Sequence, residues 1–417
     1  MIDFKSIVKE QREELDRIIT QENIIEREAL LYAQKYLSYP NVLVITGIRR
    51  CGKSIFSYLL EKGKKFAYIN FDDERLSSIL VDNLDSLLSS VYELYGEVEY
   101  IILDEIQNIN GWELFVNRLR RTKKVIVTGS NSNLLSSELA THLTGRHIDI
   151  KLFPFSFKEF LLYKKFPLSK AYTTKEKSEL LQLLEEYITL GGMPESYKFG
   201  NQILVGIYED IITKDILLRY DISKNTEFKN LARYLITNSG TEISYSKIGE
   251  ALNIGHVSTV SNWISYLENS FLFFRIDRFD FKLKKQYLSN KKFYCIDTGL
   301  INSIGFKFSE NKGRLMENLV AIELQRRKIL YNNEIYFWKD TTNKEVDFVI
   351  KSTKITELIQ VTYANSKIEI KDREKESLQK ASKELKCVNT KIITWNYEAE
   401  TEKIKYIPLW KWLIEKQ

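Results

Sequence analysis

The chain has few of the residues that interrupt or cross-link a fold. Its 417 residues include only 5 prolines and 17 glycines, which favours long helices. The 3 cysteines (Cys51, Cys295 and Cys387) are far apart and match neither a metal-binding spacing nor a disulfide framework. Apolar runs such as 271–274 are too short to span a bilayer, and the charged N-terminal stretch does not have the form of a signal peptide. These absences argue against a disulfide-rich secreted protein and a membrane-spanning one, so we expect a cytoplasmic location.

The composition is that of an ordinary folded protein. Hydrophobic residues make up 44% of the chain and charged residues 28%, so packed cores are expected and extended disorder is not. The length predicts two to four domains. The net charge is +6, from 62 basic and 56 acidic residues, an excess that permits nucleic-acid binding without requiring it.

Short apolar runs alternate with helical stretches in the first part of the chain. A helical segment is predicted over residues 4–37. Five strands are then predicted at 41–46, 66–70, 100–103, 125–128 and 147–152, with helices between them at 54–62, 83–95 and 112–121. Runs rich in β-branched residues are typical of strands buried on both faces. The alternation therefore predicts an α/β fold, a parallel sheet with helices on both faces.

The remaining sequence changes character twice. Residues 156–225 are predicted to be all-helical, with an interruption at 191–194, and three helical stretches follow in 226–275. After Gly313 one helix is predicted at 315–327, followed by strands at 335–338, 346–350 and 358–361.

A phosphate-binding loop is predicted between the first strand and the next helix. The pattern G-x-x-x-x-G-K-S has the strand–loop–helix context of a Walker A motif, whose backbone amides cradle the phosphates of ATP. In this motif Lys53 would neutralise the β- and γ-phosphates, and Ser54 would supply a hydroxyl to Mg²⁺. The predicted nucleotide-binding residues are Gly47, Ile48, Arg49, Arg50, Cys51, Gly52, Lys53, Ser54 and Ile55.

Two carboxylates follow the third predicted strand. Asp104 would hold Mg²⁺ together with Ser54, and Glu105 would polarise the water that attacks the γ-phosphate. An acidic pair about fifty residues after a Walker A motif is typical of Walker B and favours a hydrolysing motor over a kinase.

Two further residues are candidates for catalysis. Asn131 or its neighbour Ser130 follows the fourth strand, where a polar side chain would lie beside the γ-phosphate; the alternative is an N-cap for a helix beginning before Leu134. Arg146 precedes the fifth strand, at the place of an arginine finger that acts on ATP in a neighbouring subunit, although a surface arginine would look the same. An arginine finger would require a homo-oligomer.

These strings together resemble a widespread group of prokaryotic AAA+ ATPases that carry a C-terminal domain of uncharacterised function. Further matching strings are I-N-F-D-D-E-R (69–75), L-T-G-R (143–146), P-F-S-F-K-E-F (154–160) and G-G-M-P-E (191–195). The resemblance covers nearly the whole chain. It implies an AAA+ core, a winged-helix segment and a nuclease-like terminal domain, but no substrate.

Residues 244–255 and 256–267 have helix-turn-helix spacing, and 273–278 would form the wing. In the second helix Val257, Val260, Ile264 and Leu267 are expected to face inward. The exposed face would carry Ser258, Thr259, Ser261 and Asn262, which could reach DNA. The helix has no lysine or arginine, and winged helices also serve as protein contacts. A nearby basic run, expected to be a solvated face, consists of Lys282, Lys284, Lys285, Lys291 and Lys292.

The C-terminal part resembles the core of restriction-endonuclease-like nucleases. Glu317 and Asp347 match two of its acidic positions, but Gln360 stands where a metal-binding Glu is expected and Thr362 where a Lys is expected. The loss of a carboxylate weakens metal binding, and the loss of the lysine removes a cation that stabilises the transition state. The resemblance therefore implies a degenerate nuclease domain.

The sequence thus predicts a protein with five parts: an N-terminal helical segment (1–37), an AAA+ core (38–155), a helical lid (156–225), a winged helix (226–300) and the nuclease-like domain (310–417). The expected function is that of an oligomeric ATPase that uses ATP and Mg²⁺ as a DNA-associated motor or remodeller. Two alternatives stay open: an ATP/ADP switch in signalling or defence that acts through protein partners, and an ATP-gated nuclease.

Overall fold

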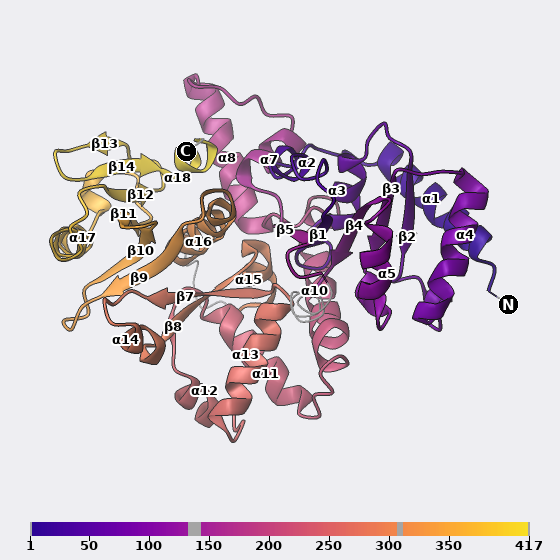
Figure 1. Ribbon diagram of the computed structural model, residues 1–417. Helices are drawn as coiled ribbons and strands as arrows, with labels where there is room; N and C mark the ends of the chain where they lie inside the picture. The colour runs from indigo at the N-terminus through magenta and orange to yellow at the C-terminus, as the bar shows by residue number, and fades with distance from the viewer. Residues whose placement is uncertain (1, 132–142, 307–311, 416–417) are drawn as a thin grey trace. The chain divides into compact units, whose positions relative to one another are not determined.

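The structure, a computed structural model, describes residues 2–131, 143–306 and 312–415 (Figure 1). The chain forms two compact units. The first consists of Met1–Phe153, Leu162–Lys165 and Asn269–Phe271, and the second of Pro154–Leu161, Phe166–Glu268 and Leu272–Gln417. Within the described ranges, no helix is both long enough and apolar enough to cross a membrane.

The first unit is built on a five-stranded sheet in which every pairing is parallel, in the order β2-β3-β4-β1-β5. The strands are β1 (Val42–Thr46), β2 (Phe66–Asn70), β3 (Tyr100–Asp104), β4 (Lys124–Gly129) and β5 (His147–Lys151). Each lies within one or two residues of its predicted range, so the predicted α/β fold with a parallel P-loop sheet is confirmed. β1 lies between β4 and β5, so the loop that follows it begins inside the sheet and not at an edge.

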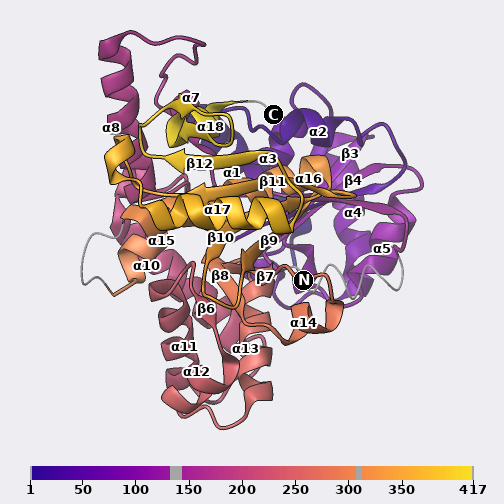
Figure 2. The same cartoon turned by 90° about the vertical axis from the view of Figure 1, so that its left-hand side faces the viewer.

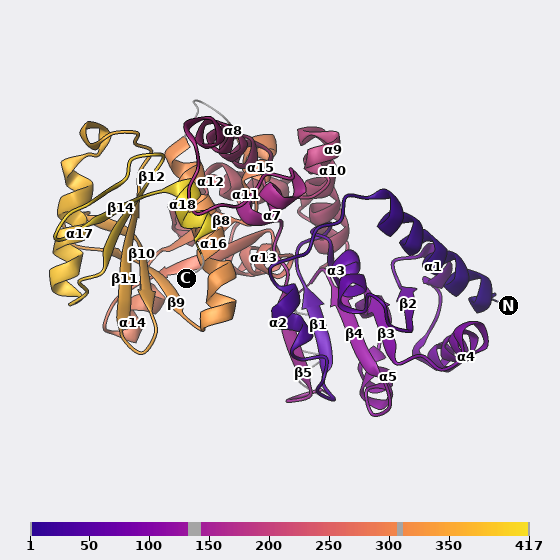
Figure 3. The same ribbon diagram turned by 90° about the horizontal axis from the view of Figure 1, so that it is seen from above.

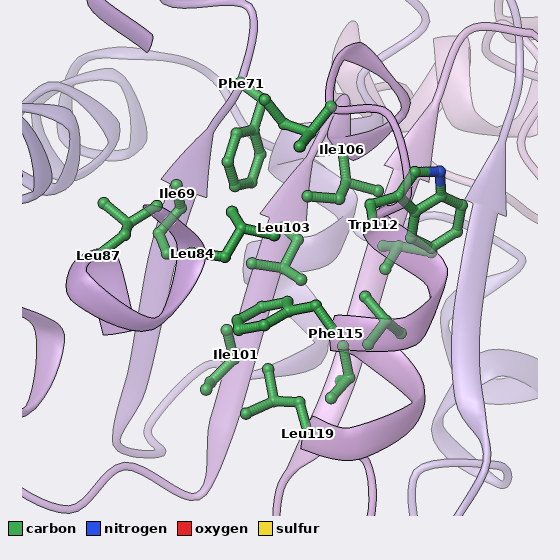
Figure 4. Close-up of a cluster of buried hydrophobic side chains, with 14 of the residues drawn as sticks. Ile69, Phe71, Leu84, Leu87, Ile101, Leu103, Ile106, Trp112, Phe115 and Leu119 are labelled. Carbon is green, nitrogen blue, oxygen red and sulfur yellow. The ribbon is translucent and has the colours of Figure 1, made fainter. Parts of the chain in front are cut away.

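Helices cover both faces of this sheet. On one face, side chains from β1–β4 pack against α1 (Phe4–Gln21), α4 (Leu84–Tyr95) and α5 (Trp112–Leu119) (Figure 3). Figure 4 shows part of this core, where Ile101 and Leu103 of β3 lie among Leu84, Trp112 and Phe115. On the other face, α3 (Lys53–Leu60) packs against β1 and β4, and α2 (Leu30–Gln34) packs against α3.

The predicted helical segment over 4–37 is interrupted in the structure. α1 ends at Gln21, Glu22 is extended (φ −90°, ψ 149°), and α2 begins only at Leu30. Tertiary hydrogen bonds hold the intervening segment: Asn23 Nδ2 donates to Tyr163 O (3.0 Å), and the guanidinium of Arg27 donates to two carbonyls of the first unit. These contacts outweigh the helical propensity of the sequence.

The second unit begins with helices. Residues 156–225, all of which are described, contain no strand, which confirms the all-helical prediction. The elements are α7 (Phe157–Tyr163), α8 (Thr174–Leu190), α9 (Ser196–Phe199), α10 (Asn201–Asp210) and a π-helix (Ile211–Leu217). The predicted interruption at 191–194 lies between α8 and α9.

A nine-stranded sheet organises the rest of the second unit, in the order β13-β14-β12-β11-β10-β9-β7-β8-β6. Residues 225–304 supply α11 (Asn225–Thr237), β6 (Glu242–Ile243), α12 (Tyr245–Ala251), α13 (Val257–Asn269), β7 (Phe273–Arg278), α14 (Leu283–Leu288), β8 (Lys291–Cys295) and α15 (Thr298–Ile304). Residues 312–414 supply α16 (Lys312–Tyr331), β9 (Glu334–Lys339), β10 (Glu345–Lys351), β11 (Ile355–Val361), α17 (Asp372–Glu384), β12 (Thr390–Thr394), β13 (Ala399–Glu400), β14 (Lys405–Pro408) and α18 (Leu409–Ile414). β7 and β9 pair in parallel and join the two segments into one sheet, and α17 covers β10 and β11 (Figure 2).

Two details of this unit differ from the sequence prediction. Val257, expected to face inward, is 51% exposed, because it is the first residue of α13 and precedes the buried turn that starts at Val260. Val260, Ile264 and Leu267 are buried as predicted. The sequence analysis also missed β6, β8, β12–β14, α14, α15 and α17. The helix expected before Leu134 lies outside the described residues.

Candidate nucleotide-binding site

The predicted phosphate-binding loop connects β1 to α3. Gly47 is buried, and a Cβ at this position would lie 2.2 Å from Leu152 O, so no larger residue fits beside the end of β5. Gly52 has φ +96° and is the N-cap of α3, a left-handed conformation that favours glycine. Arg50 is also left-handed (φ 62°). The loop therefore places backbone amides around the N-terminus of α3, the arrangement that binds anions.

Lys53, the first residue of α3, lies inside this loop. Its Nζ is 3.3 Å from Gly47 O and 3.4 Å from Ile48 O, and it forms an ion pair with Glu105 Oε1 at 3.3 Å. Burial lowers the pKa of Lys53, but the nearby carboxylates, Glu105 above all, more than offset this, so its pKa lies above the usual value. The side chain is therefore a buried ammonium, aimed at the loop and at the acidic pair.

Asp104, the last residue of β3, is held by three hydroxyl groups. Ser54 Oγ donates to its Oδ2 at 2.5 Å, Tyr68 OH donates to the same oxygen at 2.7 Å, and Thr128 Oγ1 donates to Oδ1. Burial raises the pKa of the Asp104 carboxyl and the charge of Glu105 adds to the increase, while the three donors oppose it. The structure therefore brings the two predicted metal-binding residues, Ser54 and Asp104, into direct contact. Tyr68 and Thr128 were not predicted.

Glu105 has a left-handed backbone (φ 53°), which turns its side chain back toward the loop. Its Oε2 accepts hydrogen bonds from Ser130 N and Ser130 Oγ, both at 3.2 Å, and from the Nε2 of Gln107. Burial raises the pKa of Glu105. The Lys53 ammonium, the Gln107 hydrogen bond and Arg49 together lower it by more than burial raises it, so the net shift is downward. Glu105 is thus an ionised carboxylate beside Lys53.

Arg27 is a residue of this site that the sequence analysis missed. It comes from the segment between α1 and α2, is only 6% exposed, and donates to Cys51 O at 3.1 Å and to Phe153 O at 2.6 Å. It therefore ties the loop to the end of β5. A lone arginine in a charged N-terminal segment gives no pattern from which this contact could be predicted.

The other predicted residues of the loop are placed as follows. Ile48 and Cys51 are wholly buried, Ile55 is half-buried, and Arg49 Nη1 lies 3.5 Å from Asp72 Oδ2. Burial raises the pKa of the Cys51 thiol, whose Sγ lies 3.6 Å from Leu152 O.

The two remaining catalytic candidates differ in their placement. Asn131 directly follows Ser130, which contacts Glu105, and is 1% exposed. Arg146 is exposed, and its carbonyl accepts a hydrogen bond from Val42 N, at the start of β1. The loop that holds Lys53 follows the opposite end of β1. The structure therefore brings Lys53, Ser54, Asp104 and Glu105 together but leaves Arg146 at the opposite ends of the strands.

The predicted DNA-facing elements lie in the second unit. On α13, Ser258 and Asn262 are exposed, whereas Thr259 and Ser261 are half-buried. In the basic run, Lys282, Lys284 and Lys285 are exposed, but Lys292 is not. The prediction of a solvated face is wrong for Lys292, which is 3% exposed because it forms ion pairs with Glu317 and Glu345 in the interior.

Two of the predicted nuclease-like residues lie around the same lysine. Glu317 of α16 and Asp347 of β10 both face Lys292 Nζ, at 3.0 and 4.0 Å. Gln360 and Thr362, which stand where a nuclease would have Glu and Lys, are each 8% exposed. Glu345, two residues before Asp347, is a member of this cluster that the sequence analysis missed.

Comparison with protein-family models divides the chain into three matched regions. Residues 39–161 match an AAA domain, residues 181–311 match a domain of unknown function (DUF8612), and residues 312–412 match a second domain of unknown function (DUF4143).

Similar proteins are known from an archaeon and a bacterium. The uncharacterized protein MJ1544 of Methanocaldococcus jannaschii is 38% identical over 90% of this chain and 89% of its own length. An uncharacterized protein of Haemophilus influenzae is 30% identical over 92% of this chain and 98% of its own length. Among solved structures, the Walker-type ATPase PABY2304 of Pyrococcus abyssi is similar over 68% of this chain and 97% of its own, with 16% identity and a TM-score of 0.45.

Proposed function

Since this chain belongs to the family of AAA-domain proteins that includes these archaeal and bacterial relatives, we propose that it is an ATPase that uses Mg²⁺. One observation carries the proposal. Lys53 and Ser54, the first residues of α3, form a single cluster with Asp104 and Glu105 at the end of β3, with contacts of 2.5–3.3 Å.

The donors at this cluster fit the groups that hydrolysis requires. Ser54 Oγ and the Asp104 carboxylate are hard oxygen ligands of the kind that Mg²⁺ prefers, and they already contact each other. They would hold the ion, which supplies positive charge to the phosphate oxygens. Lys53 and the loop amides would bind the β- and γ-phosphates, and Glu105 would polarise the attacking water. Asn131, next to Ser130, would orient that water or the γ-phosphate.

Steady-state ATP hydrolysis tests this assignment. We expect Lys53→Ala and Glu105→Gln each to reduce the rate by about 100-fold or more, because each removes a group that stabilises or activates a reacting atom. Glu105→Gln should still bind ATP, whereas Lys53→Ala should bind it weakly. Two exposed residues near the same elements give matched controls, Lys62→Ala and Glu99→Gln. Undiminished hydrolysis in both site variants would overturn the assignment.

The second unit supports a finer proposal for the domain order. Helices α11, α12 and α13 and the strand order β6-β8-β7 form a three-helix segment with a small sheet, as expected for the winged helix proposed at 226–300. We propose residues 156–225 as the lid of the AAA+ core (38–155), residues 1–37 as an N-terminal segment that supports that core, and residues 310–417 as a nuclease-like domain without nuclease activity.

DNA is the partner that the surface of this winged helix supports best. The segment between β7 and β8 exposes four large apolar side chains next to three exposed lysines. These are Phe281, Leu283, Tyr287 and Leu288, and Lys282, Lys284 and Lys285. Aromatic side chains interleaved with lysines can stack on bases while the ammonium groups bind phosphates. We therefore propose a DNA-associated, oligomeric ATPase whose main DNA contact is this segment, because α13 has no basic residue.

A change of charge in this segment tests the DNA proposal. In the triple variant Lys282→Glu, Lys284→Glu, Lys285→Glu we expect DNA affinity to fall and the slope of log K against log salt to shrink by about 2–3. DNA stimulation of ATP hydrolysis should fall in parallel, while hydrolysis without DNA should not change. Reversal of the exposed Lys354, Lys403 and Lys405 is the matched control. Slow hydrolysis that no form of DNA alters would instead favour the ATP/ADP switch acting through protein partners.

A further inference from the structure

A lysine ammonium lies among the carboxylates of the nuclease-like segment. The side chain of Lys292, on β8, is 4% exposed, and its Nζ is 3.0 Å from Glu317 Oε1, 2.6 Å from Glu345 Oε1 and 4.0 Å from Asp347 Oδ1. The three acids come from α16 and β10, which follow Lys292 in the chain. One cation from the winged-helix segment is thus surrounded by acids of the next segment.

Other hydrogen bonds hold these carboxylates in place. Tyr294 OH donates to Glu317 Oε1 at 2.8 Å, and Val361 N donates to Asp347 Oδ2 at 2.8 Å. The second carboxylate oxygen of Glu345 lies 3.8 Å from Lys339 Nζ, which also pairs with Glu242 of β6. The cluster is therefore built from five strands and a helix, and its geometry does not depend on a single contact.

The resemblance to nucleases implies a divalent metal at this place, and the residues present do not fit one. The oxygens that would bind it, Glu317 Oε1 and Asp347 Oδ1, are those that face the ammonium of Lys292. A divalent ion within bonding distance of both, about 2.0–2.6 Å, would stand close to that ammonium in a buried site, where like charges repel strongly. Gln360, which replaces the expected third acid, adds no negative charge.

We propose that Lys292 is the resident cation of this cluster: its ammonium takes the place of the nuclease metal and locks β8 to α16 and β10. The cluster then has a structural role, and the domain neither binds the metal nor cleaves nucleic acid. Metal binding is thus lost for two reasons: Lys292 supplies a cation at the site, and Gln360 stands where a nuclease has a carboxylate.

The test replaces Lys292 in the full chain and supplies the missing charge as Mn²⁺. Without nucleotide, Lys292→Met should lower the Tm of the second unit by roughly 5–10 °C, because the buried Asp347 and the half-buried Glu317 and Glu345 lose their counter-ion. Millimolar Mn²⁺ should restore at least half of that loss and should leave the wild-type Tm unchanged. Mn²⁺ affinity at this cluster, measured by electron paramagnetic resonance, should be at least 10-fold higher in Lys292→Met than in the wild type.

Two further variants assign the effect to this cluster. Addition of Asp347→Asn to Lys292→Met should abolish the Mn²⁺ rescue, and the exposed Lys354→Met is the matched control. If Lys292→Met does not fold, the neutral variant Lys292→Met, Glu317→Gln, Glu345→Gln, Asp347→Asn still decides, because removal of the lysine and its three acids together should restore folding. Failure of that variant to fold would overturn the proposal. So would Asp347-dependent Mn²⁺ binding or DNA cleavage by the wild-type protein.

Discussion

At the scale of single residues, the acidic pair of the nucleotide site depends on side chains that no motif reveals. The sequence pattern predicts Asp104 and Glu105 because the two acids follow an apolar strand. It does not predict Tyr68 and Thr128, which hydrogen-bond to Asp104 from β2 and β4, because their roles arise only when the three strands align in register. Arg27 and Lys292 were missed for the same reason: each is one charged residue whose partners are distant in sequence.

Tyr68 is expected to position Asp104 for Mg²⁺. In Tyr68→Phe, one of the two hydrogen bonds to Asp104 Oδ2 is lost and the ring remains, so the carboxylate should be less well oriented. We expect the Mg²⁺ concentration for half-maximal hydrolysis to rise about 10-fold, with little change in stability. Titration of ATPase activity with Mg²⁺ measures this.

Tyr58→Phe is the matched control for this prediction, since Tyr58 lies on α3 and packs edge-on against Phe66. A Mg²⁺ dependence that is the same in Tyr68→Phe and the wild type would show that Ser54 and Thr128 alone orient Asp104.

Glu61, at the end of α3, should make the first unit less stable as pH rises. Burial raises its pKa to about 8, and neither carboxylate oxygen has a hydrogen-bond partner among the described residues. Its ordinary pKa is 4.5, so between these values the folded chain keeps a proton that the unfolded chain has lost. Stability is then greatest below pH 4.5 and falls until about pH 8. Glu61→Gln should therefore add stability, by about 3 kcal/mol more at pH 8 than at pH 5.

Urea unfolding of the variant and the wild type at several pH values measures this difference, and all other titrating groups cancel in it. Glu14→Gln, an exposed change on α1, should show no pH-dependent difference. An equal gain for Glu61→Gln at pH 5 and pH 8 would mean that Glu61 is ionised in the folded protein throughout.

At the scale of elements, the strongly apolar strands were the most predictable. β1–β5 were found within one or two residues because runs of β-branched residues buried on both faces carry a clear signal. The N-terminal helix was overextended because the charged segment 22–29 keeps a helical composition while its side chains bond elsewhere. β13 and β14 were missed because they are only two and four residues long and lie among charged residues.

The glycine interruption after α8 has a specific structural cause. Gly191 has φ +76°, and a Cβ there would lie 2.1 Å from Asp297 Oδ1. The carboxylate of Asp297 accepts a hydrogen bond from Gly192 N at 2.6 Å. It also caps α15 by accepting one from Leu300 N at 3.1 Å. Gly191→Ala should therefore separate α8 from α15. We expect a loss of about 3–5 kcal/mol from backbone strain and displacement of this buried carboxyl.

Gly200→Ala is a close control for that loss, since Gly200 has nearly the same backbone (φ 66°, ψ −163°, against φ 76°, ψ −165°) but open space around it. It should lose only the strain, about 1–3 kcal/mol. Equal losses in the two variants, measured by thermal unfolding, would show that the Asp297 contact contributes nothing.

At the scale of the whole molecule, the proposed chemistry and the proposed DNA recognition belong to different units of the chain. The buried cluster around Lys53 lies in the AAA domain, and the exposed basic segment around Lys284 lies in the second unit. Sequence could predict the first because phosphate binding imposes a fixed spacing. It could not predict the lock around Lys292, which joins residues from two predicted domains in one sheet.

The proposed role of Arg146 requires a neighbouring subunit. Arg146 is exposed beside the start of β1, whereas the loop that holds Lys53 follows the end of β1. Its side chain therefore cannot reach ATP bound in its own AAA domain. If it acts on ATP in a neighbour, Arg146→Ala and Glu105→Gln should each be inactive alone. A 1:1 mixture should regain about one quarter of wild-type hydrolysis, because a quarter of the sites then combine an intact Glu105 with a neighbour's Arg146. The rate per subunit should also rise with protein concentration in the wild type.

Arg121→Ala, a nearby exposed change, should behave as the wild type. A mixture as inactive as its two components, or an Arg146→Ala variant with full activity, would mean that each subunit hydrolyses ATP on its own and that Arg146 is a surface residue.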